Sequence, residues 1–253
     1  MNENTGGRGY WNRLKAEWYR KGLKHSTLPN IAVPFMLEKA KGARTFLDVG
    51  AGCGALSIPL AKAGKSVTAL DRSPAMIGLL EEDAKKLGLR NIKTITGAWG
   101  EVHPPSRDAL LCANVPELLK VPQPFLAAAN GLARKFVFII EKADPKSDKF
   151  YYKELYPLLF NRPFEVRGDY ITTYNALHGM GIFANVEIID YDFDQPFDDL
   201  EEAVSFWKEY LGVVTEEHDK RLKDFLGKKL VKAKNGLLAK FHKKSAIIWW
   251  KKA

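Results

Sequence analysis

The sequence predicts an α/β fold in which helices cover both faces of a mostly parallel sheet, with a helical cap at the N-terminus. Three observations support this fold class. Short apolar segments alternate with helical segments between residues 45 and 140. These apolar segments lack a polar side, which is typical of parallel strands buried on two faces. Three alternate glycines follow the first of them, at the edge where such sheets bind ligands.

The composition is that of a globular protein with one large domain. The chain has 253 residues, of which 46% are hydrophobic and 27% charged. Two cysteines, Cys53 and Cys112, exclude a disulfide scaffold and a four-cysteine zinc site, and we expect no metal. The apolar runs are too short to span a bilayer, and the N-terminus lacks the apolar core of a secretion signal. We therefore expect a cytoplasmic protein with no membrane contact.

The first half begins with helices and continues with strands. Trp11, Leu14 and Trp18 recur on one helix face, and a second helix from about Val33 to Lys41 has Pro34 in its first turn. We expect residues 1–43 to form the helical cap. Ser73 is a good N-cap for a later helix. Strands and helices then alternate over residues 45–49, 55–63, 66–70, 73–87, 91–96, 109–113, 116–132 and 135–140.

The second half is richer in helices. Residues 149–160 and 170–180 predict helices, and we expect a helical lid or substrate insertion at about 145–183. Residues 185–191 alternate as a strand does. Two helices, at about 200–211 and 222–230, precede a final strand at 245–250. These elements belong to one main domain, predicted to cover residues 44–253.

Charge is distributed unevenly near the C-terminus. From Arg221 to the end, eleven basic residues accompany one acid, whereas Glu187 to Lys220 contains twelve acids and two bases. The two blocks can neutralise each other in the fold. Alternatively, the basic block can bind an anionic partner such as RNA.

The most informative segment is the glycine loop, which we define as Gly50 to Gly54. Its glycines let the backbone approach a ligand closely, and the following helix offers free N–H groups. Asp71 ends the next strand, where a carboxylate can accept both hydroxyls of a ribose. Asp48 precedes the first glycine by two residues. A pyrophosphate binder has little use for this acid, whereas S-adenosylmethionine carries an ammonium and a sulfonium.

Two segments resemble the first two motifs of the class I S-adenosylmethionine-dependent methyltransferases. They are Asp48-Val49-Gly50-Ala51-Gly52-Cys53-Gly54 and Leu70-Asp71-Arg72-Ser73-Pro74-Ala75-Met76, within a similar stretch from about Ala43 to Glu141. The resemblance implies a Rossmann-like sheet of seven strands with the last strand inserted antiparallel. It also implies S-adenosylmethionine as cofactor, with Asp71 at the ribose and Met76 beside the adenine. The expected cofactor contacts are Asp48, Gly50, Ala51, Gly52, Gly54, Asp71, Arg72, Met76, Ala98, Trp99 and Asn114.

One position departs from the family pattern. The family often has an acid after the third strand that contacts the adenine amino group, but this chain has Ala98 in Gly97-Ala98-Trp99. A backbone group can contact the amine instead. Trp99 then either packs on the adenine ring or belongs to the core, and both interpretations stay open.

The catalytic residues are less evident. Asn114-Val115-Pro116-Glu117 follows the fourth strand, where the resemblance places the methyl group, and it lacks the motif of nucleic-acid amino methyltransferases. Methyl transfer needs alignment and exclusion of water, and it needs a base only if the acceptor arrives protonated. His25 and His178 are candidate bases. Tyr170, Tyr174 and His178 share one helix face, which either lines an acceptor pocket or lies on the surface.

We therefore expect a methyltransferase that acts on a small molecule. The first alternative is an RNA methyltransferase, for tRNA or rRNA, that uses the basic C-terminal block. The second is a non-catalytic nucleotide-binding protein of the same fold. Residues 1–28 are expected to cover the cofactor and approach residues 151–180, unless their helix packs on the back of the sheet. The acceptor and the oligomeric state stay open.

Overall fold

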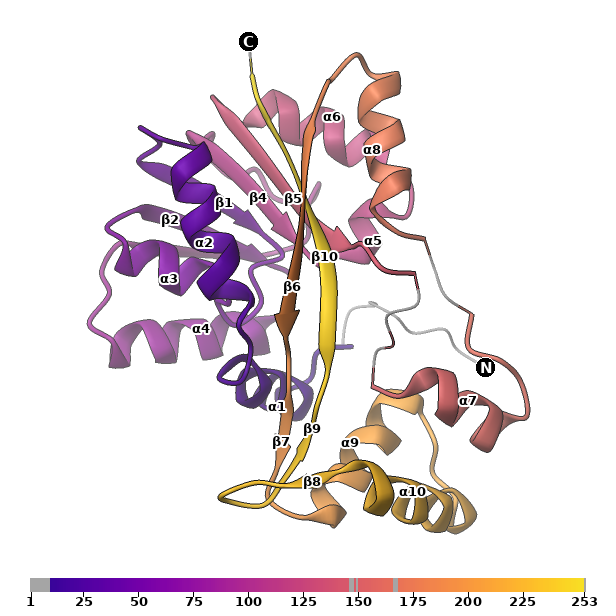
Figure 1. Cartoon of the computed structure of the whole chain (residues 1–253). Coiled ribbons are helices and arrows are strands. Elements are labelled where there is room, and N and C mark those ends of the chain that lie inside the picture. The colour runs from indigo at the N-terminus through magenta and orange to yellow at the C-terminus, as the bar shows by residue number, and fades with distance from the viewer. Residues whose placement is uncertain (1–9, 146–147, 149, 166–167, 253) are drawn as a thin grey trace.

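A seven-stranded sheet forms the centre of the molecule (Figure 1). The computed structural model describes residues 10–145, 148, 150–165 and 168–252. The strand order is β3-β2-β1-β4-β5-β10-β6, and β10 runs antiparallel to both of its neighbours while the other pairs are parallel. This order confirms the predicted fold class. The strands are β1 (Thr45–Val49), β2 (Ser66–Asp71), β3 (Ile92–Thr96), β4 (Ala109–Ala113), β5 (Phe136–Lys142), β6 (Asn185–Asp192) and β10 (His242–Lys251).

Helices cover both faces of this sheet. One face packs on α2 (Leu28–Lys39), α3 (Ser57–Lys62) and α4 (Pro74–Lys86), and Phe46 and Phe138 are fully buried on that side. The other face packs on α5 (Pro116–Leu119), α6 (Pro122–Leu132) and α8 (Tyr170–Gly179), over Leu47 and Ile139. Neighbouring residues of one strand therefore enter different cores, as alternation along a strand requires.

A second, smaller body lies beyond the carboxyl ends of the parallel strands (Figure 1). The β6–β10 pair continues into a small sheet of β7 (Gln195–Phe197), β9 (Leu237–Ala239) and β8 (Val231–Lys232). A buried cluster around Phe206 and Trp207 joins it to α1 (Arg13–Leu23), α7 (Tyr152–Phe160), α9 (Leu200–Leu211) and α10 (Glu216–Lys229). We call α7, α9, α10 and the small sheet the helical module, and α1 packs against it through Trp18.

Several boundaries differ from those predicted. The second helix begins at Leu28 because Pro29 occupies its first turn, so Pro34 lies inside the helix instead of at its start. That helix packs on the sheet, and only α1 extends over the carboxyl edge. The insertion predicted at 145–183 is divided, because α7 joins the helical module while α8 packs on the sheet. Residues 1–9 of the predicted cap lie outside the described residues.

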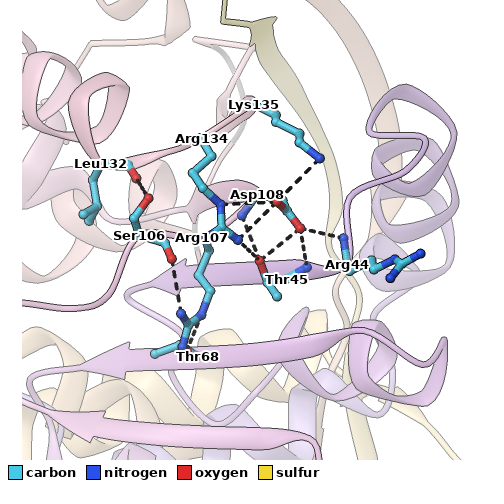
Figure 2. Close-up of polar contacts among 9 residues, drawn as sticks. All are labelled: Arg44, Thr45, Thr68, Ser106, Arg107, Asp108, Leu132, Arg134 and Lys135. Carbon is cyan, nitrogen blue, oxygen red and sulfur yellow. Dashed lines mark hydrogen bonds and ion pairs between the residues drawn. The ribbon is translucent and has the colours of Figure 1, made fainter.

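The opposite edge of the sheet is held by one carboxylate, Asp108 (Figure 2). Its Oδ2 accepts hydrogen bonds from the backbone N–H groups of Arg44 and Thr45, at 2.9 and 3.1 Å, and from the Thr45 hydroxyl. Its Oδ1 lies 3.1 Å from Arg134 Nη2. Hydrogen bonds from two backbone groups and a hydroxyl, and the nearby Lys135, outweigh desolvation and lower the pKa of Asp108 to about 2. Asp108 therefore joins the starts of β1, β4 and β5.

Candidate active site

The glycine loop follows β1 and requires glycine for its backbone path. Gly50, Gly52 and Gly54 have φ angles of +73°, +55° and +91°, a region that side chains rarely adopt. The N–H groups of Gly50 and Ala51 both donate to the carbonyl of Leu70, at 2.8 and 3.0 Å, and this ties the loop to the end of β2. The loop thus stands at the carboxyl edge, where β1 and β4 lie side by side.

Asp71 connects this loop to the next helix. Its Oδ2 accepts a hydrogen bond from the N–H of Gly52 and its Oδ1 accepts one from the N–H of Ser73, both at 2.8 Å. Burial raises the pKa of Asp71, and the two backbone donors act against that shift. Ser73 caps α4 as predicted, because its hydroxyl accepts a hydrogen bond from Met76 N. The carboxylate expected to hold a ribose is therefore oriented beside the loop.

Asp48 is the second carboxyl group at the loop, and it is fully enclosed. Only 2% of its surface is exposed, and the Ser57 hydroxyl donates to its Oδ2 at 2.6 Å. Burial raises the pKa of Asp48 to about 7, so near neutral pH it exchanges between charged and neutral forms. An acid held in this way becomes easier to ionise when a cation binds next to it.

Helix α1 covers the glycine loop. A Cβ at Gly52 would lie 3.8 Å from Tyr19 Cε1 and 3.9 Å from Met76 Sδ, so an aromatic ring and a thioether bound the space above the loop. The Ser73 hydroxyl donates to the carbonyl of Trp11 at 3.1 Å, which fixes the start of the helix over Asp71. The predicted stripe is only partly correct, because Leu14 is 49% exposed while Trp18 turns into the helical module.

A cluster of aromatic rings, part of it buried, continues from the loop into the helical module. Trp11 lies between Tyr19 and Tyr210, with ring centroids 5.4 and 6.4 Å away. Tyr210 contacts Phe150 at 5.3 Å. Tyr10, Tyr152, Tyr156 and Phe164 extend the same series of ring contacts. Only the tryptophans were noted in the sequence, because the tyrosines come from three separate segments whose convergence leaves no local pattern.

The other expected cofactor residues lie around the same edge. Arg72 pairs with Glu117 on α5 at 3.0 Å, and Met76 is buried beneath α1. Ala98 lies in the loop after β3. Trp99 packs edge to face on Phe125, 5.2 Å away, so part of its ring belongs to the core. Asn114 is exposed at the end of β4, with a φ angle of +56°, and its N–H donates to the carbonyl of Ile140.

The candidate bases and substrate residues do not gather at one place. His25 is exposed in the turn after α1. Tyr170 and Tyr174 pack against the core under α8, near the carboxyl edge. His178 is exposed at the far end of α8, which runs back toward the start of β6, and it contacts Phe183. The structure therefore separates His178 from the glycine loop, although all three residues share one helix.

Sequence reasoning also missed Glu141. It follows the apolar run of β5, and the only available signal was an acid at the end of a buried strand. Its Oε2 is buried without a hydrogen-bond partner among the described residues.

The described residues contain no cluster of histidine, cysteine or acidic groups that could hold a metal ion. No helix among them is long and apolar enough to cross a membrane.

The surroundings of the loop fit a cationic nucleoside ligand. Asp71 accepts the N–H of Gly52, Asp48 is buried two residues before the loop, and the ring of Tyr19 lies near Gly52. A tyrosine ring attracts a cation at close range, and a carboxylate accepts ribose hydroxyls. The loop has no basic side chain that would suit a pyrophosphate.

Comparisons with known proteins agree with this arrangement. The family model described as a methyltransferase domain matches residues 46–134, from β1 to just beyond α6. An uncharacterized protein of Haemophilus influenzae is 29% identical over 218 residues, which are 81% of this chain and 75% of that protein. The crystal structure of magnesium protoporphyrin IX methyltransferase from Synechocystis with bound S-adenosylhomocysteine superposes with a TM-score of 0.53. The two chains are 15% identical, and the superposition covers 96% of this chain and 89% of the Synechocystis chain.

Two relatives with named activities match shorter stretches. The chloroplastic magnesium protoporphyrin IX methyltransferase of Arabidopsis thaliana is 30% identical over 125 residues, 46% of this chain and 36% of the relative. The probable ribosomal RNA small subunit methyltransferase A of Methanosphaera stadtmanae is 33% identical over 81 residues, 32% of this chain and 30% of the relative. The chain thus matches about a third of the length of these two proteins. Sheet order, glycine loop and family match together identify an S-adenosylmethionine-dependent methyltransferase domain of class I fold in this chain, with the family match at residues 46–134.

Proposed function

We propose that this methyltransferase acts on a small molecule that enters between α1 and the carboxyl edge of the sheet. The bound cofactor supplies a methyl group activated by its sulfonium. Asp71 holds the ribose, Met76 and Trp99 flank the adenine, and the glycine loop with Asp48 holds the methionine end. Tyr19 closes the site from above and excludes water from it.

The observation that carries the choice of a small acceptor is the cover over the loop. Helix α1 lies directly on Gly52 and Ser73, and its other side packs on α9 through Trp18 and Phe206. The loop is therefore covered by aromatic rings and not by an open basic surface. Aromatic walls suit a planar or apolar molecule, whereas RNA binding depends on phosphate contacts.

Part of the basic C-terminal block is neutralised within the fold. Lys223 pairs with Glu201, Lys244 with Asp190 and Arg221 with Glu217, at 2.6 to 2.9 Å. Each pair joins a basic residue of the last block to an acid of the block before it. This pairing supports the interpretation in which the two blocks neutralise each other. The match to the ribosomal RNA methyltransferase covers only 32% of this chain. It therefore gives no support for an RNA-binding surface outside the matched stretch.

A binding panel tests the proposal first. In thermal-shift measurements we expect S-adenosylmethionine and S-adenosylhomocysteine to raise the melting temperature, and NAD to leave it unchanged. Stabilisation by NAD alone would overturn the assignment of the cofactor site. Binding of both adenosyl compounds, without methyl transfer to RNA or to small molecules, would favour a non-catalytic protein.

The acceptor class needs a transfer assay. The protein is incubated with methyl-labelled S-adenosylmethionine and either total RNA or the small-molecule fraction of a cell extract. We expect label in the small-molecule fraction only. Label in RNA, together with tRNA binding that weakens steeply with salt, would replace this proposal with the RNA alternative.

A further inference from the structure

Glu141 occupies a distinctive position at the carboxyl edge of the sheet. It lies near the end of β5, directly after Ile140, whose carbonyl accepts the N–H of Asn114 at 2.8 Å. β4 and β5 are parallel neighbours, with Ala113 beside Ile140, so Asn114 and Glu141 are the next residues along the two strands. Glu141 therefore stands beside the residue that follows β4, at the edge where ligands of such sheets bind.

One oxygen of its carboxyl group lacks the hydrogen bond that a buried acid normally makes. Glu141 Oε2 and Thr173 Oγ1 of α8 are both buried, and neither atom has a hydrogen-bond partner within 3.5 Å among the described residues, although the hydroxyl lies near enough to lower the pKa of Glu141. Leaving such a group unpaired costs on the order of 1–3 kcal/mol, and more for a charged one. A fold that serves only stability gains nothing from this arrangement. A ligand donor that reaches Glu141 would satisfy the carboxylate.

The groups around Glu141 do not neutralise it. Asp169, the N-cap of α8, acts on Glu141 as a like charge. On the β4 side lie Cys112, whose thiol is buried, and Glu117, which pairs with Arg72. On β10, Ala246 is the partner of Glu141 and Lys244 pairs with Asp190. Lys142 follows it on β5, where alternation turns the side chain to the other face.

Burial raises the pKa of Glu141 to about 7, against the opposite influence of the Thr173 hydroxyl across the interface. Near neutral pH, this carboxyl group can therefore both accept a proton and release it. A base works best when its pKa lies near the operating pH.

From this geometry we propose that Glu141 is the proton acceptor of methyl transfer, so that the acceptor molecule is one that arrives with an O–H or N–H group. The proposal rests on the proposed function. As the acceptor oxygen or nitrogen bonds to the methyl carbon, the carbon–sulfur bond breaks and S-adenosylhomocysteine leaves as a neutral thioether. Glu141 takes the proton that the acceptor loses, and it returns that proton to water afterwards.

The cofactor itself is the probe for this assignment, and no acceptor is required. S-adenosylmethionine carries a sulfonium at the reacting position and S-adenosylhomocysteine does not, while both share the ammonium and the ribose. A carboxylate beside the reacting position is stabilised by the sulfonium alone. We therefore compare the pH dependence of binding for the two ligands. Groups that respond only to the shared ammonium and ribose contribute equally to both, so their contribution drops out of the comparison.

The experiment is isothermal titration of the full chain with each ligand across a series of pH values. We expect S-adenosylmethionine to bind roughly tenfold more tightly, or better, as the pH rises through about 7, while S-adenosylhomocysteine changes much less. The sign follows from the carboxylate, which is present only above its pKa. Glu141→Gln should abolish the difference in pH dependence and keep the affinity for S-adenosylhomocysteine.

Two further variants keep the test decisive. Thr173→Val removes the hydroxyl that lowers the pKa of Glu141, so the midpoint of the transition should move to higher pH. Glu187→Gln, on the exposed side of β6, is the matched control and should leave the transition unchanged. Equal pH dependence for both ligands in the unmodified protein, or a transition that persists in Glu141→Gln, would overturn the assignment. Binding of neither ligand would instead overturn the proposed function.

Discussion

Two aspartates show how the same side chain serves opposite edges of the sheet. Asp71 accepts two backbone N–H groups at the carboxyl edge, and Asp108 accepts two at the amino edge. Burial raises the pKa of the first, whereas donors and cations lower the pKa of the second to about 2. The first carboxylate therefore holds the backbone of the glycine loop at a cost in desolvation, and the second stabilises the fold.

Replacing Asp71 tests its role at the ribose. We expect Asp71→Ala to weaken S-adenosylmethionine binding by about 1.5–3 kcal/mol, because hydrogen bonds to a charged group are lost. Asp71→Asn keeps the size and one acceptor oxygen and should weaken binding less. Isothermal titration gives both values. An unchanged dissociation constant in Asp71→Ala would show that this carboxylate does not contact the cofactor.

Replacing Asp108 tests the amino edge through its pH dependence. Asp108→Ala should lower the free energy of unfolding by about 1–3 kcal/mol at neutral pH, because several donors lose their acceptor. The pKa is lowered in the folded state, so this stabilisation is complete above about pH 4 and is lost as the pH falls toward about 2. Urea unfolding at several pH values measures the gap, which is the difference in free energy of unfolding between the unmodified protein and Asp108→Ala. Asp190→Ala, an exposed ion-pair partner, is the control and should cost less. A gap that stays constant into the acid range would contradict this account.

At the scale of elements, α1 contacts the glycine loop on one side and the helical module on the other. Trp11, which precedes the helix, and Tyr19 lie toward the glycine loop, whereas Trp18 packs on Phe206 and donates from Nε1 to Glu202 at 3.0 Å. The helix thereby connects the cofactor site to the helical module. Ion pairs from Arg13 and Arg20 to Glu82 hold it on α4 as well.

The two sides of α1 can be separated by paired substitutions. Trp11→Ala should lower the affinity for S-adenosylmethionine several-fold, because it removes a ring beside Tyr19, and it should change the melting temperature little. Trp18→Phe should cost about 1 kcal/mol of stability through the lost hydrogen bond, with cofactor affinity retained. Isothermal titration and thermal unfolding of both variants check this. The reverse pattern would show that α1 serves only the packing of the module.

At the scale of the whole molecule, the glycine loop and the helical module depend on each other through α1. Removing residues 1–28 should leave a folded sheet that binds S-adenosylmethionine weakly. It should also speed hydrogen exchange in α9, whose contact with Trp18 is lost. In the intact chain, added S-adenosylmethionine should slow exchange over residues 10–27. Full cofactor affinity in the truncated protein would contradict the covering role of α1.

The sequence predicted most of the sheet and the loop because both depend on local patterns. Glycine spacing, the N-cap Ser73 and the apolar strands are visible within a few residues, and the structure has each of them. The helices of the helical module were predicted, but their assembly around a small sheet was not, since β7, β8 and β9 have two or three residues each and pair over long separations. His178 was grouped with Tyr170 because both lie on one face of a helix. Local spacing does not reveal that this helix leads away from the site.

The place of β10 in the sheet has a consequence for the time at which the protein becomes active. β6 has β10 as its only neighbour in the seven-stranded sheet, so it has no partner until the last strand is synthesised. Long-range pairing of this kind is slow, and an unpaired strand edge invites association with other chains. The same pairing brings Phe193 to Phe241 and so carries the helical module to α1. A nascent chain therefore holds the glycine loop and α1, joined through Ser73 and Glu82, well before the helical module can pack against α1. Docking of that module waits for β10.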